Sequence, residues 1–141
     1  MTDKLRIELK SSTAGVDQLV DSFDRFSARH RLPAGVHRAV RLALDEVISN
    51  IIHHGHGDRS DHVITVELRL TRDALRVEVV DDAAAFNMLE SGRADLETFP
   101  AERPVGGLGI HLVKQSIDDI AYERRRGNNH LTLKQKLNPR R

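Results

Sequence analysis

Alternation of apolar and polar residues with a period of two predicts the first three strands of this chain. Residues 5–9 alternate leucine or isoleucine with charged side chains, and residues 63–70 repeat the pattern. A short polar turn at residues 71–73 leads into a further apolar run at residues 75–80. We therefore expect an N-terminal strand and, later in the chain, a β-hairpin.

Two more strands are expected near the C-terminus, where residues 120–126 and 130–137 flank Gly127, Asn128 and Asn129. Glycine and asparagine tolerate the positive φ angles of tight hairpin turns. These three residues are therefore predicted to form the turn.

Three segments place apolar residues at the spacing of an amphipathic helix. The first runs from Val16 to about His30. The second starts at Pro33, whose fixed φ suits a first turn, and is expected to run to about His54, before two glycines. The third covers residues 107–117.

Regular periodicity fails between residues 83 and 104. A stretch of ~20 residues without regular structure is uncommon in a small domain and is often a lid or a binding loop. The order of strand, two helices, hairpin, lid, helix and hairpin predicts a two-layer α+β sandwich. We expect a mixed, mainly antiparallel sheet with helices on one face, in a single domain covering residues 1–141.

Composition narrows the possible classes of function. The 141 residues include 22 Lys and Arg against 21 Asp and Glu, and this balance gives no support for general attraction to nucleic acid or membranes. The chain has no cysteine, which excludes disulfides and thiolate chemistry and fits a cytoplasmic location. No apolar run approaches the ~18 residues of a membrane span, and the N-terminus lacks the apolar core of a signal peptide.

Glu46, Asn50 and His54 are spaced by four residues and so share one stripe of the second expected helix. A carboxylate and an amide oxygen one turn apart suit a hard cation such as Mg²⁺, which prefers oxygen ligands. The carboxylate could instead orient or deprotonate an attacking hydroxyl group. A polar stripe that faces solvent is the third interpretation, and this segment alone does not decide among them.

Two other segments offer groups that could bind a nucleotide. Asp81 follows the expected strand at residues 75–80, where an acid can accept a hydrogen bond from an amino group such as that of adenine, or simply form a turn. Glycines at positions 106, 107 and 109 open the third helix. Such a loop can cradle phosphate at a helix N-terminus or serve as a flexible connector. It is neither a Walker A loop nor a strand-borne GxGxxG motif.

Two remaining clusters are given other interpretations. A histidine-rich cluster comprises His53, His54, His56, Asp58 and His62. Arg59 stands where a metallo-hydrolase motif would need another histidine, so a transition-metal site is disfavoured. The three arginines at residues 124–126 lack interleaved aromatic residues and are interpreted as a solvated surface.

Together these segments resemble the motifs of the GHKL ATPase superfamily, whose nucleotide site is the Bergerat fold. The resemblance is closest to the stand-alone anti-sigma-factor serine kinases and covers residues 5–137. Residues 46–55 look like the N box of that family, residues 79–87 like its G1 box, and residues 106–113 like its G2 box. Residues 129–133 look like its closing strand.

The resemblance implies ATP and Mg²⁺ as cofactors and a role for individual residues. Glu46 would be the general base acting on a serine hydroxyl, and Asn50 would coordinate Mg²⁺. Asp81 would accept a hydrogen bond from the adenine amino group, with support from Thr132. The implied cofactor-binding residues are Asn50, Asp81, Ala83, Arg103, Gly106, Gly107, Leu108, Gly109, Ile110, His111 and Thr132.

The same resemblance implies protein partners: a sigma factor that is held inactive, and a STAS-type antagonist that is phosphorylated. It also implies a homodimer. Ala83 departs from the G1 box, which has glycine at that position, and its methyl group could tighten the nucleotide pocket. A non-catalytic or nucleotide-sensing binding module of the same fold is therefore the second hypothesis. The catalytic domain of a histidine kinase is disfavoured, because the sequence has no helical hairpin carrying a phospho-accepting histidine.

Overall fold

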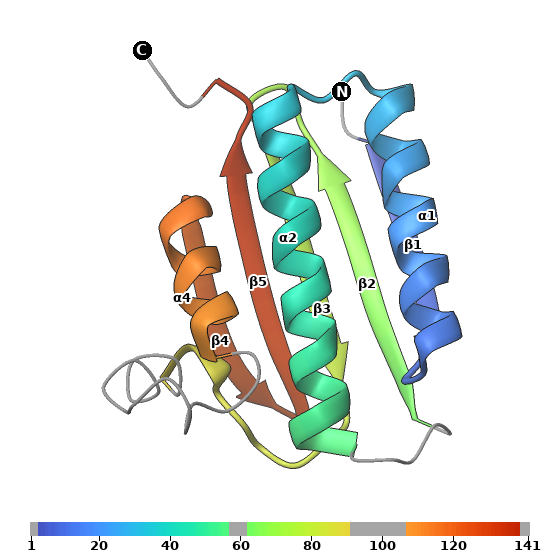
Figure 1. Ribbon diagram of the computed structural model, residues 1–141, viewed down its shortest axis with the longest axis vertical. Helices are drawn as coiled ribbons and strands as arrows, with labels where there is room; N and C mark the ends of the chain where they lie inside the picture. The colour runs from blue at the N-terminus through green and yellow to red at the C-terminus, as the bar shows by residue number, and fades with distance from the viewer. Residues whose placement is uncertain (1–2, 57–61, 91–106, 139–141) are drawn as a thin grey trace.

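The computed structural model describes residues 3–56, 62–90 and 107–138, and in them a five-stranded sheet carries its α-helices on one face (Figure 1). The strands are β1 (Asp3–Lys10), β2 (Val63–Leu70), β3 (Ala74–Asp81), β4 (Asp119–Arg125) and β5 (Asn128–Lys136). The helices are α1 (Thr13–Arg29), α2 (Ala34–Asn50) and α4 (Gly107–Ser116), and α2 continues into the π-helix η1 (Ile51–His56). The predicted order of elements and the two-layer α+β class are confirmed.

The sheet has the strand order β1-β2-β3-β5-β4, and its pairings are all antiparallel in the described residues. The last hairpin therefore inserts β5 beside the central strand β3 and leaves β4 at the edge. Because β3 and β5 run in opposite directions, Asp81 at the end of β3 lies directly opposite Asn129 near the start of β5. This register brings two distant polar residues to the same end of the sheet.

Helix α2 lies across the middle of the sheet, between α1 and α4 (Figure 1). Its apolar stripe, which includes Leu44, Val47 and Ile48, is fully buried against inward-facing strand residues such as Val66 and Val77. Burying each side chain of this size contributes ~1.5–3 kcal/mol. The packing fixes the C-terminal end of α2, and with it Glu46 and Asn50, next to the ends of β3 and β5.

The second helix differs from the prediction at its C-terminal end. The α-helix ends at Asn50, and the chain continues to His56 as a π-helix, whose turn is wider. The four-residue α-helical spacing therefore does not extend from Asn50 to His54. The side chain of His54 lies outside the described part of the structure.

The predicted turn at residues 127–129 is also displaced. Arg126 and Gly127 form the turn, with φ angles of 52° and 80°, as a two-residue hairpin of this twist requires. Asn128 and Asn129 belong to β5 instead. Asn129 is buried, and its environment is described below.

The predicted lid covers residues 83–104, and residues 91–106 lie outside the described part of the structure. Within the described ranges, no helix has the length and apolar character of a membrane span.

Candidate functional site

Four elements converge at one end of the molecule: the C-terminal end of α2, the N-terminal end of α4, the last residue of β3 and the start of β5 (Figure 1). They carry Glu46, Asn50, Gly109 and Asp81, which the sequence assigned to three separate motifs. The fold thus brings these residues to one end of the sheet. Their individual roles in binding and catalysis stay predictions.

Glu46 carries the most unusual side chain of this region. Its Oε2 atom is buried and has no hydrogen-bond partner among the described residues. Burial raises the pKa of the Glu46 carboxyl group above its ordinary value, and the neighbouring charge of Asp45 raises it further. A carboxylate in this environment holds a proton more tightly than an exposed glutamate, which is the property expected of a general base.

Gly109, in the first turn of α4, lies directly against Glu46. A Cβ atom at position 109 would come within 2.1 Å of both Cδ and Oε1 of Glu46, so only glycine fits without displacing the carboxylate. The first N–H groups of an α-helix have no partner inside the helix and favour negative charge. The contact therefore places the N-terminal end of α4 beside the carboxyl group of Glu46, one oxygen of which is buried.

Asn50 is buried one helical turn beyond Glu46. Its Nδ2 donates a hydrogen bond of 3.8 Å to Sδ of Met88, and a thioether is a weak acceptor. The predicted role of Asn50 in binding Mg²⁺ is not tested by this contact.

Asp81 is also buried, and its Oδ1 atom accepts two hydrogen bonds. The backbone N–H of Ala83 donates at 2.9 Å, and Nδ2 of Asn129 donates at 3.0 Å. Oδ2 accepts no hydrogen bond from the described residues. The carboxylate is therefore held by one of its oxygen atoms.

Asn129 is a structural residue of this site that sequence reasoning missed. Its Oδ1 accepts hydrogen bonds from the Tyr122 hydroxyl at 2.5 Å, from Arg124 at 3.2 Å and from the backbone N–H of Phe86 at 3.4 Å. Its Nδ2 bonds to Ala84 O as well as to Asp81. One buried amide thus connects β3, β4, β5 and the segment after β3. The available signal was its place in the apolar alternation of β5, two residues before Leu131 and four before Leu133.

The structure corrects one other expectation about β5. Thr132 pairs with Glu78 in register and projects from the opposite face of the sheet to Asp81, so it does not support that carboxylate. The arginines at 124–126 are all exposed, as the interpretation of a solvated surface predicts, and two of them also bind neighbouring residues. Arg124 donates to the carbonyl of Ala83 at 2.7 Å, while Arg125 forms ion pairs with Glu78 and Glu123.

Ala83 replaces the expected glycine without backbone strain, because it is not among the described residues with positive φ. Its side chain is buried and lines a small cavity together with Asp81, Phe86, Met88 and Asn129. The volume of this cavity is about 10 Å³. That is room for about one water molecule. The methyl group of Ala83 therefore takes up space in a cavity that is already small.

Several predicted site residues cannot be placed, or serve the core. Arg103 and Gly106 lie outside the described residues, and so do the side chain of Leu108 and most of the histidine cluster. Gly107 begins α4, Ile110 is buried in the core, and His111 is partly exposed. In the described ranges no three His, Asp or Glu side chains gather as metal ligands would. His62 instead bonds to Asp82 at 3.1 Å.

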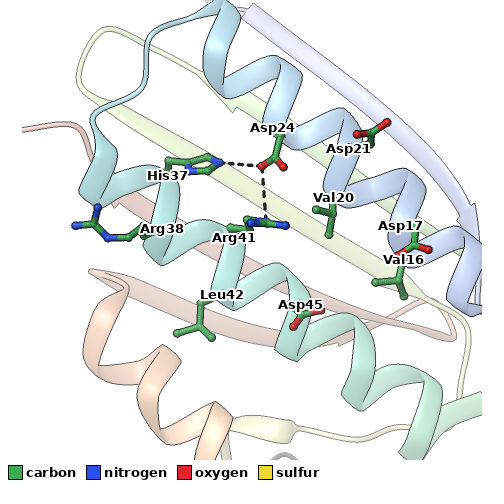
Figure 2. A pocket seen from close by; sticks show the side chains of 10 residues that line it. All are labelled: Val16, Asp17, Val20, Asp21, Asp24, His37, Arg38, Arg41, Leu42 and Asp45. Atoms are coloured by element: carbon green, nitrogen blue, oxygen red, sulfur yellow. Dashed lines mark hydrogen bonds and ion pairs between the residues drawn. The ribbon is translucent and has the colours of Figure 1, made fainter.

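A far larger hollow lies elsewhere, between α1 and α2 (Figure 2). Its volume is about 670 Å³, and Asp24 reaches across it to His37 at 2.8 Å and to Arg41 at 3.7 Å. Asp45 lines this groove, whereas the next residue, Glu46, points toward α4. The groove contains none of the predicted nucleotide-binding residues.

Comparison with known proteins identifies the class. A model of the histidine kinase-like ATPase domain family matches residues 9–135, so the chain belongs to this family.

Among curated proteins, the chain is similar to the serine/threonine-protein kinase BtrW of Bordetella bronchiseptica, with 29% identity over 94% of this chain and 92% of that protein. It is 27% identical to the serine-protein kinase RsbW of Listeria monocytogenes, over 85% of this chain and 79% of that one. It is 24% identical to the anti-sigma F factor of Clostridium perfringens, over 98% of this chain and 99% of that protein.

Solved structures share the fold. The RsbU and RsbW domains of Rv1364c from Mycobacterium tuberculosis superpose with a TM-score of 0.68 at 15% identity, over 94% of this chain and 32% of that chain. A chain of the SiaB–SiaC complex from Pseudomonas aeruginosa superposes with a TM-score of 0.60 at 12% identity, over 94% of this chain and 89% of that chain.

Proposed function

We propose that this protein is an ATP- and Mg²⁺-dependent protein-serine kinase that acts as an anti-sigma regulatory factor. Family membership supports nucleotide use, and curated relatives are named serine kinases and anti-sigma factors. The single observation that carries the proposal is the Glu46 carboxyl group, which lies against the N-terminal end of α4 and whose Oε2 atom is buried with no hydrogen-bond partner in the described residues.

The residues present fit a nucleotide chemically. Asp81 has one oxygen held by Asn129 and a second oxygen that no described residue engages, as an acceptor for the adenine amino group would need. The N–H groups of the first turn of α4 suit phosphate oxygens. The cavity of about 10 Å³ is too small for a base, so Phe86 or Met88 must move when the nucleotide enters.

In this proposal Glu46 would accept the proton of a serine hydroxyl as the hydroxyl oxygen bonds to the γ-phosphorus of ATP. The bond from that phosphorus to the β–γ bridging oxygen would break, so that ADP leaves and phosphoserine forms. Its raised pKa favours that transfer, since a desolvated carboxylate is a stronger base than an exposed one. Asn50 would supply its Oδ1 atom to Mg²⁺, while its Nδ2 atom donates the weak hydrogen bond to Met88. The bound cation would neutralise charge on the phosphates.

The proposed partners are a sigma factor, which the protein would hold inactive, and a STAS-type antagonist, which it would phosphorylate on serine. The relatives named anti-sigma F factor and RsbW support this assignment. Phosphorylation of the antagonist would leave the kinase available to the sigma factor.

The test is transfer from labelled ATP to a STAS-type antagonist, with phosphoserine identified by mass spectrometry. Asn50→Ala should weaken binding of ATP with Mg²⁺ more than binding of ATP without metal, because only the first requires the amide oxygen. Thr132→Ala is a matched control on the opposite face of the sheet. It should change neither the affinity for ATP with Mg²⁺ nor the affinity for ATP without metal. Equal effects of Asn50→Ala on both forms would remove Asn50 from the metal site.

A second candidate is a non-catalytic or nucleotide-sensing module of the same fold that regulates a partner by binding alone. The small cavity beside Ala83 favours it. Calorimetry would then show partner binding without phosphoserine, whereas phosphoserine on the antagonist would exclude this alternative.

A further inference from the structure

A single row of cations crosses four neighbouring strands on the sheet face opposite the helices. In register, Lys4 of β1 lies opposite Arg69 of β2, Arg69 opposite Arg76 of β3, and Arg76 opposite Lys134 of β5. All four side chains are exposed. We call these residues the cationic row. It lies toward the β2–β3 hairpin, at the end of β3 that is remote from Asp81.

Like charges directly opposite each other on paired strands destabilise a sheet. Acids offset part of this repulsion, because Asp119 of β4 lies directly opposite Lys134 at the end of the row. Arg69 contacts Glu67 at 3.6 Å, whereas Lys4, Arg76 and Lys134 form no ion pair with any described residue. The row therefore carries a concentration of positive charge that the described acids neutralise only in part, although the formal net charge of the whole chain is only +1.

The surface is hollowed beside three of the four residues of the cationic row, Arg69, Arg76 and Lys134. Arg69, Arg76, Lys134 and Lys136 line a depression of about 520 Å³, in which Asp73 is the only acid among the lining residues. A partner with negative charge could therefore contact several of these cations at once.

We propose that the cationic row is a docking surface for an acidic α-helix of a partner protein. Paired strands lie ~4.8 Å apart, so the four cations span ~14 Å. In an α-helix, residues i+3, i+7 and i+10 lie ~4.5, ~10.5 and ~15 Å along the axis from residue i, and all four residues occupy one face. A helix that crosses the strands can therefore present one carboxylate to each cation.

The neighbouring row argues against a broad polyanion. The next positions on the same face, two residues along each strand, are Arg6, Glu67 and Glu78. The two glutamates would repel the phosphates of a nucleic-acid duplex or an anionic membrane spread over the whole face. A narrow partner with one acidic stripe avoids that repulsion, and its docking does not depend on nucleotide binding or kinase activity.

The test uses a fluorescein-labelled helical peptide with glutamates at i, i+3, i+7 and i+10, measured by fluorescence anisotropy at low ionic strength. The double variant R76S/K134S should weaken binding about tenfold, because both partners are then missing from the centre of the row. The matched control R29S/K10S removes the same charges from exposed residues without ion pairs in the described structure, and should change affinity less than about twofold. Thermal unfolding should show both double variants folded, with R76S/K134S at least as stable as the parent.

Four results would overturn the proposal. Equal weakening by R76S/K134S and R29S/K10S, or no binding of the peptide, would remove the row as the docking site. Equal binding of a peptide with the same composition but glutamates spread around the helix would remove the single acidic stripe. Row-dependent binding of duplex DNA or anionic phospholipid vesicles that is tighter than that of the peptide would replace the helix with another partner.

Discussion

The polar residues at the two ends of β3 lie in opposite environments, one buried and one exposed. At its C-terminal end, Asp81 is buried and held by Asn129, which also binds Tyr122 and Arg124. Near its N-terminal end, Arg76 is exposed between two other cations and forms no ion pair with a described residue. A buried polar group without a partner is costly, whereas an exposed cation stays solvated by water. The buried end can therefore hold one small ligand in a defined position, and the exposed end remains available to a partner.

The largest effect is expected from Glu46→Gln at the buried end. Removing a general base should lower phosphoryl transfer by ~10²–10⁴-fold while ATP binding persists, since glutamine keeps the shape but cannot accept the proton. Single-turnover transfer and nucleotide titration on the same preparation measure the two quantities. Transfer that continues at the parent rate would exclude Glu46 as the base.

Asn129→Ala should damage the same end by leaving Asp81, Tyr122 and Arg124 without a shared partner. Each buried group left unsatisfied costs ~1–3 kcal/mol, so both the free energy of unfolding and the affinity for ATP should fall. Chemical denaturation and calorimetry provide the measurements. Thr132→Ala, three residues away on the other face, is the control, and similar losses in both variants would argue against Asn129 as the organiser of the pocket.

Gly109→Ala tests the contact between α4 and Glu46. The added methyl group would lie 2.1 Å from the carboxylate, so α4 or Glu46 must move, and overpacking of this kind costs ~1–3 kcal/mol. Gly35→Ala in α2 is the matched control, because a Cβ there meets nothing within 4 Å. It should stabilise the helix by up to ~1 kcal/mol. Stability changes of the same sign in denaturant unfolding would contradict the contact.

The smallest effect should come from the exposed end. R76S/K134S removes two repulsive cross-strand pairs, Arg69–Arg76 and Arg76–Lys134, and one attractive pair, Lys134–Asp119. The net effect should be to raise the free energy of unfolding by ~0.2–1 kcal/mol at low salt, with a smaller gain at high salt. Denaturation at two salt concentrations checks this. A loss of stability at low salt would mean that these cations hold the sheet together, and the contrast between the two ends of β3 would fail.

Periodicity alone predicted most of the fold. The alternation of residues 63–70 predicted β2 at the bounds that the structure gives, and helical spacing predicted α1, α2 and α4 within a few residues. These signals are local, because each element buries one face. The end of α2 was not predictable in the same way, since the change to a π-helix at Ile51 leaves no mark in the apolar pattern.

The site was predicted only in part, because its geometry depends on tertiary contacts. The sequence pointed to Glu46, Asn50, Asp81 and Gly109, but nothing local shows that Gly109 touches Glu46. Thr132 was assigned to Asp81 by resemblance, although Leu131 and Leu133 alternate with it and already indicate that it faces outward. The prediction placed Asn129 in the turn and not in β5. Because side chains alternate between the faces of a strand, only its place in β5 indicates that Asn129 faces inward and contacts Asp81.

The central claim is that Glu46 is a desolvated carboxylate with a raised pKa, ready to accept a proton. Titration of the Glu46 side-chain carbon by ¹³C NMR, assigned with Glu46→Gln, tests it most directly. We expect a pKa above the ordinary glutamate range. Because the folded state then binds more protons than the unfolded state, the parent should lose stability relative to Glu46→Gln as pH rises from the ordinary to the raised pKa. A Glu46 signal that titrates in the ordinary range, with stability curves that run parallel, would contradict the account.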